Sequence, residues 1–409
     1  MTNFPPPRTR CEIRGTIPPC SPKSRAVSVI PKQPLSNNHR ESQGGFSLIE
    51  LMIAISLGLL IMAGLTSIFV KNSQARSEIE RSNRQLESGR YAMTLLTEEL
   101  RMAGFLAAFD PYELIIRPNS PPLGADTAPV TAAMTAMPDP CATSVADLNK
   151  AFFFHVQGID NASTIPSCVS DARAGSDILV IRRVSTCVAG PTLEAGCDAV
   201  VNGAPYFQSS NCYQATELAK NSGGPAAAKD YQAHFVLNTD TTTMTTHALN
   251  CTAIADYRRY LIHIYFVANN NVGTDGIPTL KRAELGAAGF TIVPLVEGIE
   301  TIQFEYGVNT VSADGKVDVY TADPNAYSAC VGATCVGYWL RTYAVKVNLL
   351  ARNVDKSPGW TDSKIYTLGL KADGTSNVFP VSGTFADAYK RHAYNAAVRL
   401  DNPSGRRSP

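Results

Sequence analysis

The chain has 409 residues, of which 44% are hydrophobic and 17% are charged, and its formal net charge is +1. The length allows one large domain or two ordinary ones, and the charged fraction lies below the rough quarter that is usual for soluble domains, which indicates a surface covered by a membrane or by partners. Because the whole chain has no basic excess, nucleic acid is not indicated as a partner.

The charge is unevenly distributed along the chain. Residues 1–45 hold seven Lys or Arg and two acidic residues, a net of +5, which leaves −4 for the remainder. A basic segment ahead of an apolar run is typical of a cytoplasmic flank under the positive-inside rule, so we expect everything beyond the run to face outward.

A long apolar run covers residues 51–70. It has 20 residues and no charge. As a helix it would be about 30 Å long, which is enough to cross the hydrocarbon core of a bilayer. Glu50 stands at its start, in the sequence GGFSLIE. A carboxylate near a bilayer centre costs roughly 2.5–3.5 kcal/mol, so such a residue is functional by default. A cut between Gly45 and Phe46 would create a mostly cationic α-amine that could pair with Glu50 of the same or a neighbouring subunit.

The sequence GFSLIELMIAISLGLL, residues 45–60, resembles the cleavage site and N-terminal helix of type IV prepilins and type II secretion pseudopilins. In that family a membrane-embedded aspartic peptidase cuts after the glycine on the cytoplasmic side and methylates the new N-terminal residue, and a glutamate near that end serves in subunit assembly. The resemblance implies cleavage between Gly45 and Phe46, N-methylation of Phe46 and an assembly role for Glu50.

Three other interpretations of the run explain less. A conventional signal peptide cut near Ser73–Ala75 would have a shorter apolar stretch and leaves Glu50 unexplained. A plain uncleaved anchor accounts for neither Gly45–Phe46 nor Glu50. A buried core helix is disfavoured by 20 consecutive uncharged residues.

The leader departs from the family pattern, because prepilin leaders are typically short and this one spans residues 1–45. Residues 35–45 resemble an ordinary short leader, whereas residues 1–34 are rich in Pro and Arg and lack periodicity. Two interpretations remain open: residues 1–34 result from a misassigned start site, or they form a long disordered cytoplasmic leader. In both, we expect the leader to be absent from the mature protein.

A helix is predicted over about residues 46–104, ended by Gly104 and Pro111. Its first half, 46–70, is expected to be transmembrane, and its second half to pack on a globular domain through one apolar stripe, with Glu98 and Glu99 as solvated charges. Residues 87–105 resemble PilW-type minor pilins, which are related to the J-type minor pseudopilins of type II secretion. The predicted stripe consists of Ile79, Leu86, Met93, Leu96, Leu100 and Ala103.

The remainder, residues 105–409, is predicted to be a β-rich periplasmic domain, so that the whole is an α+β, pilin-like protein whose long helix packs on an antiparallel sheet. Strands are expected where β-branched and aromatic residues gather, and residues 269–276 form a turn that lacks the EF-hand order of calcium ligands. Loops are expected at 117–140 and over 185–258, including the Thr-rich run 239–246. The predicted strands are 177–184, 260–268 and 343–353, and the blocks 294–308, 313–320 and 390–407 resemble strand blocks of the PilW and J types.

Eight of the ten cysteines lie beyond the apolar run, and Cys11 and Cys20 lie in the leader. An even number on the oxidising side of a membrane indicates disulfides rather than free thiols, and zinc is disfavoured because no CxxC pair is present. Many pairings are possible, and pairing of sequence neighbours is favoured. These pairs are Cys141–Cys168, Cys187–Cys197, Cys212–Cys251 and Cys330–Cys335.

No catalytic motif stands out: HExxH, GxSxG, P-loop and GxGxxG are all absent, and His263 is expected to be a strand residue rather than a base. We therefore predict no enzyme, cofactor or metal site.

The resemblance implies a minor pilin at a tip or priming position, acting in pilus assembly, adhesion or twitching motility. Its expected partners are the prepilin peptidase, other minor pilins, the major pilin and a tip adhesin, and it is expected to span the inner membrane once before entering the pilus. The alternatives are a type II secretion pseudopilin, a membrane-anchored periplasmic binding protein or enzyme, and a DNA-uptake pilin.

Overall fold

The computed structural model describes residues 45–109, 136–212, 214, 216–217, 234–310 and 315–406. The predictions on the leader up to residue 44, and on residues 117–135 of the expected loop, fall outside these residues. The chain divides into two compact units, Met1–Ser67 and Ile68–Pro409.

Helix α1, Leu48–Met102, has 55 residues and confirms the long N-terminal helix. It begins after Ser47, whose hydroxyl oxygen accepts a hydrogen bond from the backbone N–H of Ile49 at 3.3 Å. It ends where Gly104 takes a φ of 68°, which glycine adopts without strain. The N–H of Gly104 then donates to the carbonyl of Arg182 at 2.9 Å, so the end of the helix is tied to a strand.

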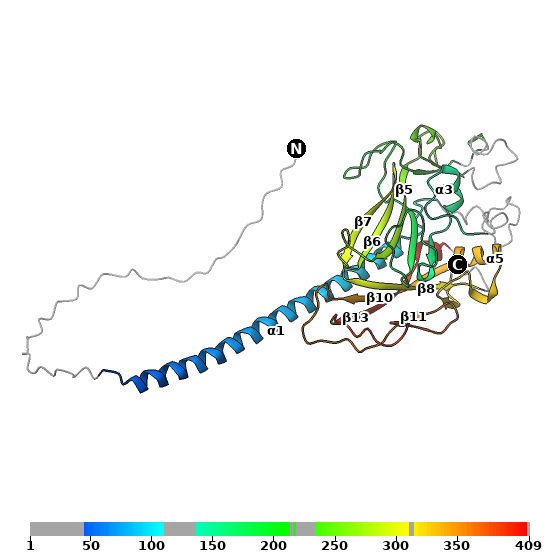
Figure 1. The fold of residues 1–409 in the computed structure, drawn as a ribbon. Coiled ribbons are helices and arrows are strands. Elements are labelled where there is room, and N and C mark those ends of the chain that lie inside the picture. Colours follow the sequence, from blue (N-terminus) through cyan, green and yellow to red (C-terminus); the bar gives the residue numbers. More distant parts are fainter. Residues whose placement is uncertain are drawn as a thin grey trace, which may run out of the picture. The chain divides into compact units, whose positions relative to one another are not determined.

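Antiparallel sheets make up the rest of the described domain (Figure 1). The larger sheet has the order β1-β2-β5-β3-β4, and the hairpin β6-β7 is attached to β5. A second sheet has the order β13-β10-β8-β9, and β11 and β12 form a separate ribbon. The strands are β1 Val156–Ile159, β2 Ile178–Val184, β3 Tyr206–Ser209, β4 Phe235–Asn238, β5 Tyr257–Ala268, β6 Thr279–Gly286, β7 Gly289–Glu297, β8 Ile299–Val308, β9 Val319–Thr321, β10 Thr342–Arg352, β11 Tyr366–Leu370, β12 Ser376–Phe379 and β13 Arg391–Arg399.

Short helices connect these strands in the residues that the structure describes. In the Cys330–Cys335 disulfide, Cys330 directly follows the η5 turn and Cys335 lies in α5. After the last strand, α6 is bonded back to α1: the Asn402 side chain donates to the carbonyl of Arg101 at 3.1 Å. The elements are α3 Val145–Ala151, η1 Asp160–Ala162, η4 Thr241–Thr243, η5 Tyr327–Ala329, α5 Ala333–Leu340 and α6 Asp401–Gly405.

The strands predicted at 177–184, 260–268 and 343–353 correspond to β2, β5 and β10. The block 294–308 differs, because Gly298 divides it into β7 and β8. Gly298 has a φ of 77°, and a Cβ there would lie 2.7 Å from the carbonyl oxygen of Arg352. The strands on its two sides pair in different sheets, β7 with β6 and β8 with β10. This glycine is therefore where the chain passes from one sheet to the other.

One hydrophobic core joins the C-terminal half of α1 to both large sheets. Met93, Leu96 and Leu100 are buried in it, as predicted. The prediction was wrong at Ile79, whose side chain is 61% exposed. The buried side of α1 begins only at Gln85, since the sheets do not extend over the earlier turns.

Candidate functional site

The candidate cleavage segment precedes α1. Gly45, Phe46 and Ser47 lie outside regular structure, and nothing lies within 4 Å of a Cβ built on Gly45. Phe46 is 84% exposed, and Glu50 is an exposed residue in the first turn of α1. The Gly45–Phe46 peptide bond is thus in an open, non-helical segment.

The first half of α1 exposes almost every large apolar side chain from Phe46 to Val70. By length and composition this helix is able to cross a membrane. Exposed apolar area of this extent is unfavourable in water, so it requires lipid or other apolar helices around it. Glu50 is the one ionisable side chain between Phe46 and Val70.

The second half of α1 is held on the sheet of β13, β10 and β8 by residues that the apolar stripe did not include. The Gln85 side chain donates to the carbonyl oxygens of Ala351 and Lys390, both at 3.0 Å. At Gly89, a Cβ would lie 2.2 Å from Cε2 of Tyr394. The Tyr394 hydroxyl donates to the carbonyl of Leu86 at 3.3 Å. Gly89 and Gln85 lie on the face of Met93, because they precede it by four and eight positions. Extending the predicted stripe back in steps of four would have placed both of them on the packed side of the helix.

Replacing Gly89 by alanine is expected to destabilise the domain by about 1–3 kcal/mol, since the new methyl group would overlap the Tyr394 ring. Urea unfolding of the full chain in detergent measures this loss. Gly337→Ala in α5 is the matched control, because its nearest neighbour would be Nη2 of Arg341 at 3.8 Å. Adding Tyr394→Ala to Gly89→Ala should recover part of the loss, and additive losses would contradict the proposed overlap.

An ion-pair cluster joins α1 to the larger sheet and corrects the prediction that Glu99 is a solvated charge. The Glu99 carboxylate contacts Nη2 of Arg183 at 3.1 Å and Nδ1 of His263 at 3.0 Å. Burial raises its pKa, but hydrogen bonds and charge from His263 and Arg183 outweigh this effect and lower the pKa of Glu99 from 4.5 to about 2. His263 is a buried strand residue on β5, and its role here is to bind Glu99.

Because the folded pKa of Glu99 lies below its ordinary value, its stabilising contribution is complete above about pH 4.5 and is lost as the pH falls toward 2. We expect Glu99→Gln to lower the free energy of unfolding at pH 7 by on the order of 2–3 kcal/mol. The difference from the unmodified chain should shrink below pH 4.5. Denaturant unfolding at a series of pH values tests this, with the exposed neighbour Glu98→Gln as control. A pH-independent difference would contradict it.

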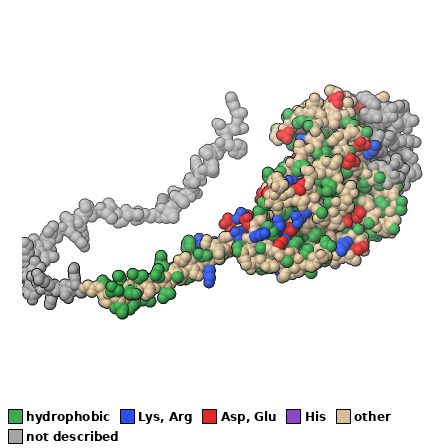
Figure 2. Space-filling model, viewed as in Figure 1, with side chains coloured by type: hydrophobic (Ala, Val, Ile, Leu, Met, Phe, Trp, Pro, Cys, Tyr) green, Lys and Arg blue, Asp and Glu red, His purple; other side chains and the backbone are tan. Residues whose placement is uncertain are grey.

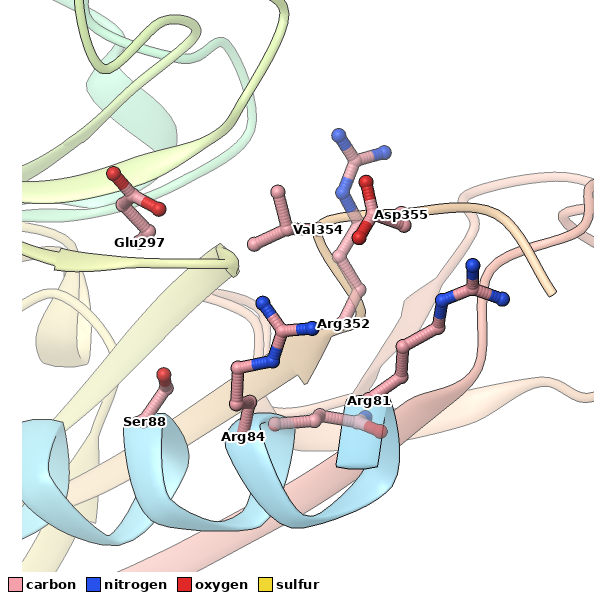
Figure 3. Close-up of a pocket in the computed structure, with 8 residues that line it drawn as sticks. Arg81, Arg84, Ser88, Glu297, Arg352, Val354 and Asp355 are labelled. Atoms are coloured by element: carbon pink, nitrogen blue, oxygen red, sulfur yellow. The ribbon is translucent and has the colours of Figure 1, made fainter. Parts of the chain in front are cut away.

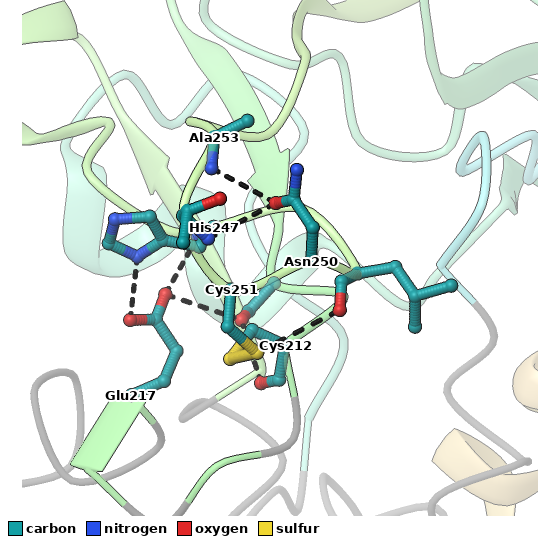
Figure 4. Close-up of a disulfide and its surroundings, with 9 residues drawn as sticks. Cys212, Glu217, His247, Asn250, Cys251 and Ala253 are labelled. Atoms are coloured by element: carbon teal, nitrogen blue, oxygen red, sulfur yellow. Dashed lines mark hydrogen bonds and ion pairs between the residues drawn. A yellow bond between two sulfur atoms is a disulfide. The ribbon is translucent and has the colours of Figure 1, made fainter.

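Four disulfides join the cysteine pairs that sequence order favoured. They close sequence separations of 27, 10, 39 and 5 residues. Figure 4 shows the pair with the largest separation, Cys212–Cys251, beside the Glu217–His247 ion pair at 2.8 Å. The segment 185–258, predicted to be loops held by disulfides, also contains the short strands β3 and β4. The disulfides therefore fix the connections around a small additional part of the larger sheet.

A buried ionic cluster surrounds Arg391 at the start of β13. Its guanidinium donates to Glu300 at 3.2 Å, to Asp362 at 3.0 Å and to Asp387 at 2.7 Å. The side chains of Arg391 and Asp362 are fully buried, and that of Glu300 is 5% exposed. Because Glu300 is on β8 and Asp362 lies in the loop after β10, this cluster fixes that loop to the sheet.

These features define a class of protein: a pilin-like α+β chain with one long apolar N-terminal helix, an acid at its start, and antiparallel sheets packed on its second half. Residues 40–66 match the prokaryotic N-terminal methylation motif. Residues 264–402 match the family of the type IV pilus-assembly protein W, PilW. Over these two ranges the chain is therefore similar to type IV prepilins of the PilW type.

The PilW match begins near the end of β5 and includes β6 to β13. The similar block at 87–105 lies outside both matched ranges. No curated protein matches the chain. A solved structure that resembles it is a type IV-like pilin from Thermus thermophilus, with 14% identity, a TM-score of 0.19, and coverage of 35% of this chain and 66% of that one, just under two thirds of its length.

Proposed function

We propose that this chain is a minor pilin that is cut between Gly45 and Phe46, methylated at Phe46, and built into a type IV pilus through Glu50 and the apolar half of α1. The main support for the proposal is that the two halves of α1 differ. Residues up to Val70 are apolar and exposed, whereas the helix from Gln85 onward has a side buried against the domain. Such a helix offers one half to a membrane or to neighbouring helices and keeps the other half as a rigid connection.

Before assembly, residues 46–70 span the inner membrane and the domain lies in the periplasm. The four disulfides support this side of the membrane, because disulfides persist in oxidising compartments. The bulky domain beyond residue 105 favours a tip or priming position over a repeated shaft position. There it would associate with other minor pilins, the major pilin and a tip adhesin, in support of adhesion and twitching motility.

The test is the N-terminus of the full chain expressed with and without a prepilin peptidase, determined by intact mass and terminal sequencing. We expect a chain that starts at N-methylated Phe46 only when the peptidase is present. A retained leader, or a start near Arg76, would contradict the proposal and favour an anchored or secreted periplasmic protein.

A second measurement separates a pilus from a type II secretion system, whose pseudopilins share the N-terminal motif. The PilW match at residues 264–402 supports the pilus. Deletion of the gene is expected to reduce surface pili and twitching and to leave protein secretion unchanged. Loss of secretion with normal pili would favour the pseudopilin.

A further inference from the structure

Basic and aromatic side chains occur on α1 after its apolar half and on the loops beside it. We call it the collar and define it as Lys71 and Arg76 on α1, Lys356 and Trp360 in the loop after β10, and Lys390 ahead of β13. In the space-filling view, Lys and Arg side chains lie among Asp and Glu side chains where α1 enters the domain (Figure 2). Because all five residues belong to the unit Ile68–Pro409, their arrangement is that of one compact body.

Lys390 joins the loop of Trp360 to α1. Its Nζ contacts the Glu78 carboxylate at 2.8 Å and lies 5.6 Å from the centre of the Trp360 ring. Glu78 is eight residues after Val70, about 12 Å along the helix axis. Trp360 is 37% exposed, so part of the ring is open to a partner. The loop that carries Trp360 is therefore held beside α1 about two helical turns beyond the end of the apolar run.

The collar has a positive net charge. Within the described part of the chain, no ion pair is recorded for Lys71, Arg76 or Lys356. The acid Glu78 is shared by Lys390 and by Arg81 at 2.8 Å, which together with a bond from Ser357 lower the pKa of Glu78 to about 2. Its charge is thus neutralised locally.

The hollow recorded beside the collar is small. The hollow between α1 and the sheet ends, lined by Arg81, Arg84, Ser88, Glu297 and Arg352, has a volume of about 30 Å³ (Figure 3). This is room for about one or two water molecules. The charge of the collar is therefore presented to a surface rather than to a bound molecule.

We propose that the collar binds the anionic phospholipid headgroups of the membrane that holds α1, so that the domain docks on the lipid before assembly and leaves it when the helix is withdrawn. The headgroup region extends roughly 5–8 Å beyond the hydrocarbon on each side. Lys71 and Arg76 follow Val70 by about 2 and 9 Å along the helix, and Glu78, which binds Lys390, follows it by about 12 Å. Transmembrane helices are tilted by about 20° on average, and such a tilt brings one side of the domain, here the loop of Trp360, toward the headgroups. Tryptophan with nearby lysines is the side-chain combination typical of a membrane interface.

The inference rests on the proposed membrane insertion of residues 46–70. The experiment therefore measures docking of the collar and insertion of the helix separately. The full chain is reconstituted in phosphatidylcholine vesicles with and without phosphatidylglycerol, and tryptophan fluorescence is quenched by a lipid spin-labelled at its headgroup. The chain has two tryptophans, and Trp339 is fully buried, so the quenched signal reports Trp360. Resistance to alkaline extraction measures insertion.

We expect stronger quenching in the anionic vesicles, weakened by added salt and abolished by Trp360→Phe. Arg76→Gln with Lys356→Gln should lower the ratio of docked to undocked domain by about 25-fold, since each basic side chain near an anionic surface contributes about fivefold. Lys150→Gln with Lys371→Gln, which removes the same charge outside the collar, should have no effect.

Equal quenching in neutral and anionic vesicles, or equal effects of the two double variants, would overturn the inference. So would an inserted chain whose Trp360 is not quenched, and in that case the proposed function would stand. A chain that alkaline extraction removes from the vesicles would instead overturn the membrane insertion on which both depend.

Discussion

Replacing Arg391 by alanine is expected to lower the free energy of unfolding by about 3–5 kcal/mol, the range for breaking a buried ion pair by removing one partner. The change leaves Glu300 and Asp362 buried, with Arg173 as the remaining recorded cation on Glu300, at 3.3 Å. This loss of stability arises because two buried carboxylates lose their shared cation, and charges in a low-dielectric interior are poorly solvated. It is therefore larger than the net stabilisation that the intact ion pairs provide.

Urea unfolding of the full chain in detergent measures this effect. Arg84→Ala is the matched control, since the Arg84 side chain is 63% exposed and lies 3.8 Å from Glu80, a geometry that contributes less than about 1 kcal/mol. Arg391→Met combined with Glu300→Gln and Asp362→Asn removes both the cation and its buried acids, and should recover a large part of the loss. A loss below that of the control would show that the cluster is not stabilising through charge.

The helix and the main strands could be predicted because their signals are local. The uncharged run before Val70, the stripe from Met93 to Leu100, and the β-branched stretches of β2, β5 and β10 depend on residues close in sequence. The cysteine pairs could be anticipated because neighbours in sequence are the simplest choice. The segment from Gly45 to Glu50 is also one short motif within the matched range 40–66, and its cleavage and assembly role stay predictions.

The contacts that fix the domain on the helix could not be predicted in this way. The helical spacing places Gly89 on the packed face, but the need for glycine there arises from the ring of Tyr394, which is 305 positions away in the sequence. Glu99 looked like an ordinary surface acid until β2 and β5 placed Arg183 and His263 beside it. Gly298 looked like part of one strand, and only the pairing of β7 and β8 in different sheets explains it. Each of these roles depends on which distant element is adjacent, which residue type and spacing do not specify.

Replacing Glu50 by glutamine is expected to leave cleavage and membrane insertion intact and to reduce incorporation into pili by about 100-fold or more. In the proposed pilin, which is cut between Gly45 and Phe46, the amine of Phe46 would need an anionic partner in the apolar interior of a helix bundle. Glu50 is the one acid available between Phe46 and Val70, and no ion pair is recorded for it within the described residues. Removing the acid leaves a buried cation unpaired, at a cost of about 3–5 kcal/mol per subunit contact.

The measurement is the amount of this protein in sheared pili relative to the membrane fraction. Glu50→Asp keeps the carboxylate and should retain part of the assembly, whereas Glu80→Gln, which removes a 73% exposed acid from the same helix outside the apolar run, should assemble normally. Normal incorporation of Glu50→Gln would rule out the amine pairing. Loss of the cleaved form in the membrane would place the role of Glu50 in processing instead. Because glutamine is easier to bury than glutamate, poorer membrane insertion is not expected. A loss confined to the pilus fraction would therefore assign the role of Glu50 to contacts between subunits.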